Sequence, residues 1–270
     1  APGRTRREYC YNILVSGLDD DNGGSDTNIL VRFDVPNKRI DLVSLPRDTL
    51  LHNEYSNNKI NFAYAKGGTE LLMEQIENLL GIPVDFYVTV NLKGFIALVD
   101  QIDGVDFDIP INMDYDDPYQ DLHIHFTKGP RHLNGQEAME VVRFRHNNDG
   151  TGYGTEDIGR IGTQQAFLKA VAKQLLQIGN VKNIPALVDI FYTYVKTDLT
   201  TGNLVWLGNE ALNIGTENIH FATLPGDGSG YYNKQSVYVL DAQATCDLVN
   251  EALNPYNEAL TLEDMDILVP

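Results

Sequence analysis

Short apolar runs alternate along this chain with longer stretches in which apolar residues recur every three or four positions. Residues 11–17 and 27–34 are short runs rich in Val, Ile and Leu, which is typical of buried strands. A turn at 35–39 leads to a third predicted strand at 40–45. Residues 59–81 predict helical structure, because apolar side chains share one helical face and Gly81 ends the pattern. That face consists of Leu71, Leu72, Ile76, Leu79 and Leu80.

The rest of the chain continues this alternation. Further strands are predicted at residues 84–91, 104–111 and 218–226, and hairpin and loop structure at 112–135. Helices are predicted at 92–102, 135–145, 157–178, 184–195 and 201–212, and a short strand and helix at 237–254. No repeat or low-complexity linker interrupts the pattern. We therefore predict an α/β fold with a mixed central β-sheet flanked by helices on both faces, as a single domain over residues 1–270.

The net charge of the chain makes some classes of binding partner less plausible than others. The chain carries 38 Asp and Glu residues against 20 Lys and Arg residues, which gives a formal net charge of -18. Nucleic-acid binding depends largely on a basic surface, so this balance argues against a nucleic-acid partner. No apolar run approaches the ~20 residues that a membrane-spanning helix needs.

Cysteine and histidine offer little candidate chemistry. Cys10 and Cys246 lie near opposite ends of the chain. They are either two buried free thiols or a single disulfide, and a disulfide would indicate an oxidising compartment. Because there is no CxxC motif and the six histidines show no spacing typical of zinc ligands, we expect no zinc site.

An acidic loop joins the first two predicted strands. Asp19 and Asp26 lie at the two ends of this loop, within SGLDDDNGGSDTN (residues 16–28), where a tight turn would bring their carboxylates together. Hard oxygen ligands with room for water and phosphate oxygens suit Mg²⁺. A solvated acidic turn is the alternative explanation.

Two basic residues mark further candidate positions. Arg47, in the stretch SLPRDT, follows the third predicted strand, where open α/β folds place ligand contacts. An ion pair with Asp48 is the alternative. Lys59 is a polar position in the otherwise apolar segment KINFAY, and it is either a ligand contact or a surface lysine.

The stretch RFRHNNDGTGYGTEDIGR, residues 143–160, concentrates arginines in an acidic protein. Two arginines are expected at the end of one helix, and a third shares a face with a glutamine at the start of the next. Helix N-termini attract anions, and guanidinium groups bind phosphate oxygens bidentately, so the stretch predicts a pyrophosphate pocket. Ion pairs with Glu156 and Asp157 are the alternative. The candidate residues are Arg143, Arg145, Arg160 and Gln164.

Taken in order, several motifs resemble the LytR–CpsA–Psr family of bacterial cell-envelope proteins. They are GLD…SDT, SLPRDT, KINFAYAKGG, NLKGFIALVDQIDGVDFDIP, LNGQEAMEVVRFR and DIGRIGTQQ. The resemblance covers about residues 12–240, and the ordered set is specific although each motif alone is not. It implies an α/β domain on the extracytoplasmic face of the cell membrane in mainly Gram-positive bacteria. It also implies an N-terminal membrane anchor preceding Ala1.

The resemblance further implies an enzymatic function. Members of this family move a glycopolymer, such as teichoic acid or capsule, from a polyprenyl-pyrophosphate carrier to peptidoglycan. The leaving group is polyprenyl phosphate. The implied activity is therefore a Mg-dependent phosphotransferase, with Mg²⁺ as cofactor and Mn²⁺ as the alternative ion. The rival interpretations are a polyprenyl-pyrophosphate hydrolase and a non-catalytic polyprenyl-phosphate-binding or regulatory module.

The family's functional positions can be transferred to this chain. Its magnesium-binding aspartates fall on Asp19 and Asp26. Its pyrophosphate-binding residues fall on Arg47, Arg143, Arg145, Arg160 and Gln164, with Asp157 as a supporting carboxylate, and we add Lys59 as a substrate contact. The residues predicted to act in catalysis are Arg47, Asp26, Arg143 and Arg145.

Two positions depart from the family pattern. Gly24 stands where the family usually has an arginine, two residues before the SDT aspartate. Thr163 stands where the family usually has a basic residue before the paired glutamines. Because each departure removes a cation, we expect weaker phosphate binding than in a typical member.

Overall fold

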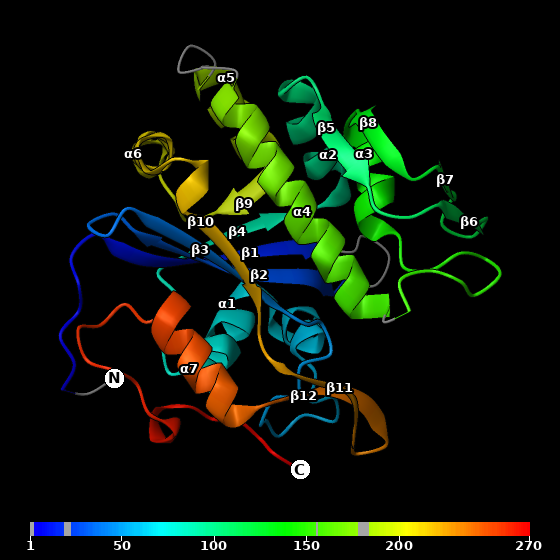
Figure 1. Ribbon diagram of the computed structural model, residues 1–270. Helices are drawn as coiled ribbons and strands as arrows, with labels where there is room; N and C mark the ends of the chain where they lie inside the picture. The colour runs from blue at the N-terminus through cyan, green and yellow to red at the C-terminus, as the bar shows by residue number, and fades with distance from the viewer. Residues whose placement is uncertain (1–2, 19–22, 155, 178–183) are drawn as a thin grey trace. The chain divides into compact units, whose positions relative to one another are not determined.

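The computed structural model describes residues 3–18, 23–154, 156–177 and 184–270 (Figure 1). The chain divides into two compact units. Unit 1 consists of Ala1–Asn91 and Lys196–Pro270, and unit 2 consists of Leu92–Val195. Unit 2 is therefore inserted in sequence between two parts of unit 1.

A mixed sheet forms the centre of unit 1. Its described strands run in the order β10-β3-β2-β1-β4-β9. The pairs β1–β2 and β2–β3 are antiparallel, whereas β1–β4 and β3–β10 are parallel. The strands are β1 (Cys10–Leu18), β2 (Ser25–Asp34), β3 (Arg39–Leu45), β4 (Phe86–Val90), β9 (Val195–Thr197) and β10 (Ile219–Thr223).

Helices cover both faces of this sheet (Figure 1). The helices α1 (Ile60–Leu80) and α7 (Ala242–Ala252) pack on one face, in a core that includes Leu14, Leu30 and Ile76. The helix α6 (Thr201–Ile214) packs on the other, where Leu207 lies in a cluster with Ile13. Alternate residues of β1 thus face opposite layers, as the two-residue repeat of a strand requires. The predicted mixed sheet with helices on both faces is confirmed.

Unit 2 packs helices and two strand pairs around its own core. The helices are α2 (Leu92–Gln101), α3 (Gly135–Arg143), α4 (Glu156–Gln177) and α5 (Ile184–Tyr194). The antiparallel pairs are β5 (Val105–Ile109) with β8 (Gly129–Leu133), and β6 (Met113–Asp117) with β7 (Leu122–Phe126). Phe144 and Phe167 are among its fully buried side chains. Gly135 begins α3 where a Cβ atom would lie 2.3 Å from the carbonyl oxygen of Ile96, so the close approach of α2 and α3 requires glycine.

The sequence pattern predicts most of these elements and misses the short ones. Each predicted helix is present, and α1 crosses the Gly67–Gly68 pair with a kink in non-helical backbone conformation. The pattern does not predict β9. Of the hairpin formed by β11 (Gly226–Tyr232) and β12 (Gln235–Leu240), it predicts only a short strand that corresponds to β12. Glycine-rich and three-residue strands carry too few apolar positions to show a period.

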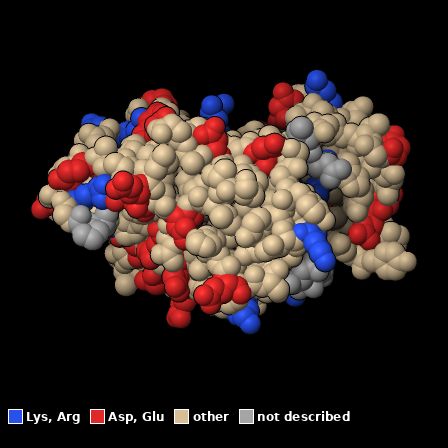
Figure 2. All heavy atoms as spheres, turned by 90° about the horizontal axis from the view of Figure 1, so that it is seen from below, with Lys and Arg blue, Asp and Glu red and all other residues tan. Residues whose placement is uncertain are grey.

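The remaining sequence-level alternatives concern cysteine and surface charge. Cys10 and Cys246 are both buried free thiols, so the free-thiol interpretation is confirmed, and burial raises the pKa of each. Acidic side chains spread over the face drawn in Figure 2, with basic side chains between them and no broad basic surface in that view. Among the described helices, none combines the length and apolarity needed to cross a membrane.

Candidate functional site

The first predicted site residues lie in unit 1, at the end of the sheet where β1 and β3 finish, β2 begins and α1 starts nearby. Asp26 is the second residue of β2, and Arg47 follows the end of β3. Antiparallel pairing places Asn28 opposite Leu45, so the start of β2 and the end of β3 share this end of the sheet. Lys59 is the N-cap residue of α1 and lies at the same end, because it forms an ion pair with Asp48.

Opposite charges alternate among these side chains. Arg47 Nη1 lies 2.8 Å from Asp26 Oδ1, and Arg47 Nε lies 3.8 Å from Asp48 Oδ1. Lys59 Nζ lies 3.2 Å from the same Asp48 oxygen. The side chains of Arg47, Asp26 and Lys59 are 26%, 31% and 19% exposed. The structure therefore brings three predicted residues together in a partly open group, with Asp48 between the two cations.

A buried polar network lies at the same ends of β1 and β2, and sequence reasoning missed it. Ser16 Oγ donates to Asn28 Oδ1 at 3.0 Å, and Asn28 Nδ2 donates to Ser25 Oγ at 3.1 Å. Thr89 lies opposite Ser16 in the strand register of β4 and β1 and is 3% exposed, but its hydroxyl has no hydrogen-bond partner among the described residues. Buried polar groups need hydrogen-bond partners, so such a network holds the end of the sheet in one arrangement. Its sequence signal is a polar residue in each of several otherwise apolar strands.

The predicted metal ligands are only partly described. Asp19 lies outside the described residues; Leu18, which precedes it, pairs with Ser25, the neighbour of Asp26. A partly exposed carboxylate such as Asp26 is the ligand type that Mg²⁺ prefers, because this ion keeps several waters and takes phosphate oxygens. The donor chemistry of Asp26 therefore fits the predicted ion.

The glycine that replaces the family's arginine lies next to this group. A Cβ atom on Gly24 would lie 3.4 Å from the backbone oxygen of Asn61, at the start of α1. That distance is an ordinary van der Waals contact, so a Cβ atom can be accommodated at this position.

The second group of predicted residues lies in unit 2, around the end of α3. A capping box begins the helix: Asn134 Oδ1 accepts from the N–H of Glu137, and Glu137 Oε2 accepts from the N–H of Asn134. Arg143 occupies the last turn, where a cation interacts favourably with the helix dipole. Its Nη2 donates to Gln120 Oε1 at 2.6 Å, in the turn between β6 and β7.

The residues that follow Arg143 are held along β6 by asparagine side chains. Asn147 Oδ1 accepts from the N–H of Asp114 at 2.7 Å, and Asn148 Oδ1 accepts from the N–H of Asp116 at 2.6 Å. Asn148 Nδ2 donates back to the carbonyl of Asp116 at 3.0 Å. The two asparagine side chains therefore bond to backbone groups of β6, as a neighbouring strand would. These bonds hold the segment that follows Arg143 against the hairpin.

The first turns of α4 pack against the end of α3. Gln164 Nε2 donates to the carbonyl of Val142 at 3.2 Å, one residue before Arg143. Arg160, one helical turn before Gln164, is 4% exposed. Arg143, Arg145 and Arg160 thus lie on adjoining elements of unit 2, while Arg47 belongs to unit 1. The side chain of Asp157 lies outside the described residues, and phosphate binding by this group stays a prediction.

Thr163, the second position that departs from the family pattern, forms a hydrogen bond between neutral groups. Thr163 is 4% exposed, and its hydroxyl donates to the Tyr153 hydroxyl at 2.7 Å. Burial raises the pKa of Tyr153, so this phenol stays protonated over the physiological range. The pair supplies packing and one hydrogen bond where a typical member has a cation.

Comparison with known proteins identifies the family. Residues 5–254 match the model of the LytR_cpsA_psr family, which covers both units. The chain belongs to the LytR–CpsA–Psr family. The resemblance based on sequence motifs is therefore confirmed.

Three relatives indicate what members of this family do. The chain is 33% identical to the polyisoprenyl-teichoic acid–peptidoglycan teichoic acid transferase TagV of Bacillus subtilis over 248 residues, which are 87% of this chain and 61% of TagV. It is 32% identical to the transferase TagU of Bacillus cereus, with 89% and 77% of the two chains covered. It is 30% identical to the regulatory protein MsrR of Staphylococcus aureus, with 83% and 67% covered. The chain thus spans less than two thirds of the length of TagV.

The fold agrees with this assignment. The crystal structure of B. subtilis TagV superposes with a TM-score of 0.77 at 28% identity, covering 97% of this chain and 100% of the TagV chain. This LytR–CpsA–Psr chain therefore shares its architecture with a relative named as a teichoic acid transferase.

Proposed function

We propose that this chain is a cell-wall phosphotransferase that moves a teichoic acid- or capsule-like glycopolymer from a polyprenyl-pyrophosphate carrier to peptidoglycan. The observation that carries the proposal is the pairing of Arg47 with Asp26 at 2.8 Å, beside Lys59, on the family's motif positions. The names of the relatives TagV and TagU support the same reaction class. As the family resemblance implies, the reaction takes place at the extracytoplasmic face of the membrane.

The proposed reaction exchanges one phosphorus–oxygen bond for another. A peptidoglycan hydroxyl oxygen attacks the phosphorus bonded to the glycopolymer. The bond from that phosphorus to the bridging oxygen breaks, and polyprenyl phosphate leaves with the electron pair. The hydroxyl proton passes to a carboxylate, either Asp19 or Asp26, or to solvent.

In this proposal, two groups of basic side chains bind phosphate oxygens and balance their negative charge. The predicted phosphate contacts of unit 1 are Arg47 and Lys59, beside Asp26, and those of unit 2 are Arg143, Arg145 and Arg160. Negative charge grows on the leaving phosphate, so fixed guanidinium groups stabilise the transition state more than the bound substrate. Mg²⁺ or Mn²⁺ held by Asp19 and Asp26 would add Lewis-acid polarisation of the phosphate oxygens. Gln164 and Asp157 are the predicted supporting contacts.

Arg143→Ala tests this proposal, with Arg131→Ala as the matched control. Arg131 lies on β8, is 48% exposed and pairs with Glu137 rather than with a predicted site residue. We expect Arg143→Ala to lower transfer of lipid-linked polymer to peptidoglycan oligomers about 10²–10³-fold, as loss of one charge-stabilising contact commonly does. Polyprenyl phosphate should still bind within about tenfold, because the apolar tail supplies ~0.8 kcal/mol per buried CH₂. Arg131→Ala should transfer normally.

The same assay separates the rival functions. Release of polymer phosphate without acceptor would identify a hydrolase. If no donor were consumed while polyprenyl phosphate bound tightly, the chain would be a binding or regulatory module, the kind of role that the name of MsrR indicates. Full transfer by Arg143→Ala would remove Arg143 from the mechanism.

A further inference from the structure

The solvent face of the β6–β7 hairpin gathers two histidines and two aspartates. Antiparallel register places Asp114 opposite His125 and Asp116 opposite His123. All four side chains are exposed, while Ile124 and Phe126 on the other face are buried in the core of unit 2. The hairpin core therefore fixes the backbone from which the polar group projects.

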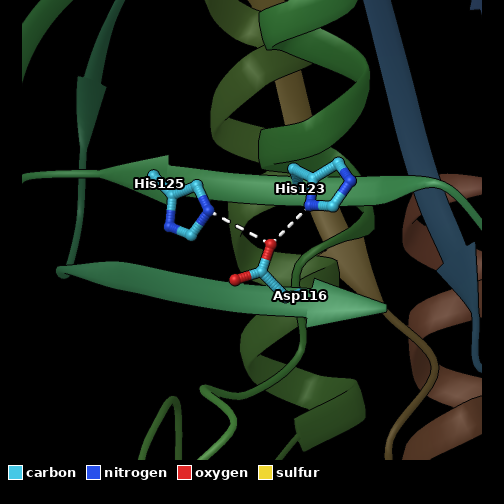
Figure 3. A group of neighbouring side chains, drawn as sticks. All are labelled: Asp116, His123 and His125. Carbon is cyan, nitrogen blue, oxygen red and sulfur yellow. Dashed lines mark hydrogen bonds and ion pairs between the residues drawn. The ribbon is translucent and has the colours of Figure 1, made fainter. Parts of the chain in front are cut away.

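Three of these side chains converge on one point. One ligand atom each from Asp116, His123 and His125 lie within 4.8 Å of one another. His123 Nδ1 lies 2.5 Å from Asp116 Oδ1, and His125 Nε2 lies 3.2 Å from the same oxygen. Figure 3 shows the two imidazole rings on β7 directed toward the carboxylate on β6.

The remaining ring nitrogens face further carboxylates. His125 Nδ1 lies 2.8 Å from Asp114 Oδ1, and His123 Nε2 lies 3.5 Å from Asp121 Oδ1 in the turn. A metal-bound histidine usually hydrogen-bonds a carboxylate through its other nitrogen, which fixes the ring and its tautomer. Each histidine here has one nitrogen for the ion and a carboxylate at the other, so the group has both a ligand set and its supporting contacts.

We propose that Asp116, His123 and His125 bind a zinc ion on the β6–β7 hairpin. Two imidazole nitrogens and one carboxylate oxygen are a ligand set typical of Zn²⁺, whereas Mg²⁺ prefers a set made of oxygen ligands alone. Three protein ligands leave a fourth tetrahedral position open to water or to a ligand. Bonds of about 2.0–2.2 Å to one ion require only small rotations of exposed side chains. The proposal reverses the expectation of no zinc site, because His-x-His becomes a ligand pair only when a strand places both rings on one face.

A second His–Asp pair in unit 2 provides the matched control. His132 Nδ1 lies 2.7 Å from Asp106 Oδ1 between β8 and β5, and the two side chains are 54% and 82% exposed. No third ligand joins this pair among the described residues. The pair therefore has the same histidine–carboxylate contact as the proposed site but lacks the third ligand.

Calorimetry with ZnCl₂ on the intact chain tests the proposal. We expect one zinc ion per chain, bound unchanged in the presence of excess Mg²⁺. His123→Ala and His125→Ala should each weaken binding more than about 100-fold, since loss of a supporting partner alone costs about 10–100-fold. Asp114→Asn should cause that smaller loss, and His132→Ala should cause none.

Several results would overturn the assignment. They are the absence of zinc binding, displacement of zinc by Mg²⁺, or equal losses in His125→Ala and His132→Ala. Circular dichroism of each variant checks that the fold is retained. Because Asp114→Asn keeps the size of the side chain and removes its charge, its graded effect tests the site even if a histidine variant folds poorly.

Discussion

Arg47 is paired on two sides, and this pairing determines how it can meet a substrate. Its guanidinium contacts Asp26 and approaches Asp48, which in turn contacts Lys59. In the proposed reaction, an incoming pyrophosphate would compete with these carboxylates for the same cations. A divalent ion on Asp26 would relieve that competition, because the carboxylate charge would then be shared with the metal. The residue contacts therefore give a physical reason for coupling between metal and pyrophosphate binding.

Gly24→Arg should strengthen pyrophosphate binding. A Cβ atom fits at this position beside Asn61, and an added guanidinium would supply the cation that the family resemblance implies there. We expect about tenfold tighter binding of pyrophosphate, which corresponds to ~1.4 kcal/mol, near the low end for a hydrogen bond to a charged group. Calorimetry with inorganic pyrophosphate in the presence of Mg²⁺ measures the change.

Gly24→Gln is the control for the added side chain without its charge. Equal affinities of the arginine and glutamine variants would contradict the electrostatic argument.

At the scale of elements, the ends and kinks of helices position the site. Lys59 precedes α1, and α1 is kinked at Gly67–Gly68, with residues buried in the core on both sides of the kink, such as Ile60 and Ile76. Gly81 ends the helix in the left-handed conformation, with φ of 67°. The sequence pattern predicts this end, and the structure adds a close approach of the backbone of Asp264.

Gly→Ala substitutions at the C-cap of α1 and inside α6 should change stability in opposite directions. A Cβ atom on Gly81 would lie 2.3 Å from the carbonyl oxygen of Asp264, and φ is positive there, so Gly81→Ala should cost about 1–3 kcal/mol. A Cβ atom on Gly208, inside α6, would meet nothing within 4 Å, so Gly208→Ala should add about 0.5–1 kcal/mol. Urea unfolding measures both. The same sign for both substitutions would contradict this account.

At the scale of the whole chain, unit 1 is closed by contacts between its two ends. The two terminal guanidinium nitrogens of Arg4, Nη1 and Nη2, each donate to the carboxylate of Asp264 at 2.6 Å. These two side chains are 15% and 17% exposed. The N–H of Thr261 and Arg4 lower the pKa of Asp264. The ion pair between Arg4 and Asp264 therefore joins the first and last segments of the chain.

This ion pair should make stability depend on pH in the acid range. The folded pKa of Asp264 lies below its unfolded value of about 3.9. Its contribution is then fully present above the unfolded pKa and is lost as pH falls through the folded pKa. We expect Asp264→Asn to lower the free energy of unfolding at pH 7 and the difference from the native chain to shrink below about pH 4. Urea unfolding at several pH values measures this difference, and a difference that stays constant would contradict the role of the carboxylate.

The sequence by itself determined the family and most of the elements, and it predicted the kind of chemistry. Apolar periodicity predicts α1, α4 and the central strands, because burial of one face is a local property of the pattern. The motifs SLPRDT and DIGRIGTQQ carried the family resemblance. Residue type alone indicated that carboxylates and guanidinium groups would meet phosphate and a hard cation.

Only the tertiary structure decided which side chains meet. Three contacts join residues of different strands or of a segment that follows a strand: Arg47 with Asp26, Ser16 with Asn28, and His123 with Asp116. These contacts depend on strand order and register, and a shift of one residue would turn each side chain to the opposite face. Such register is set by the packing of the whole core, so local sequence patterns do not contain it.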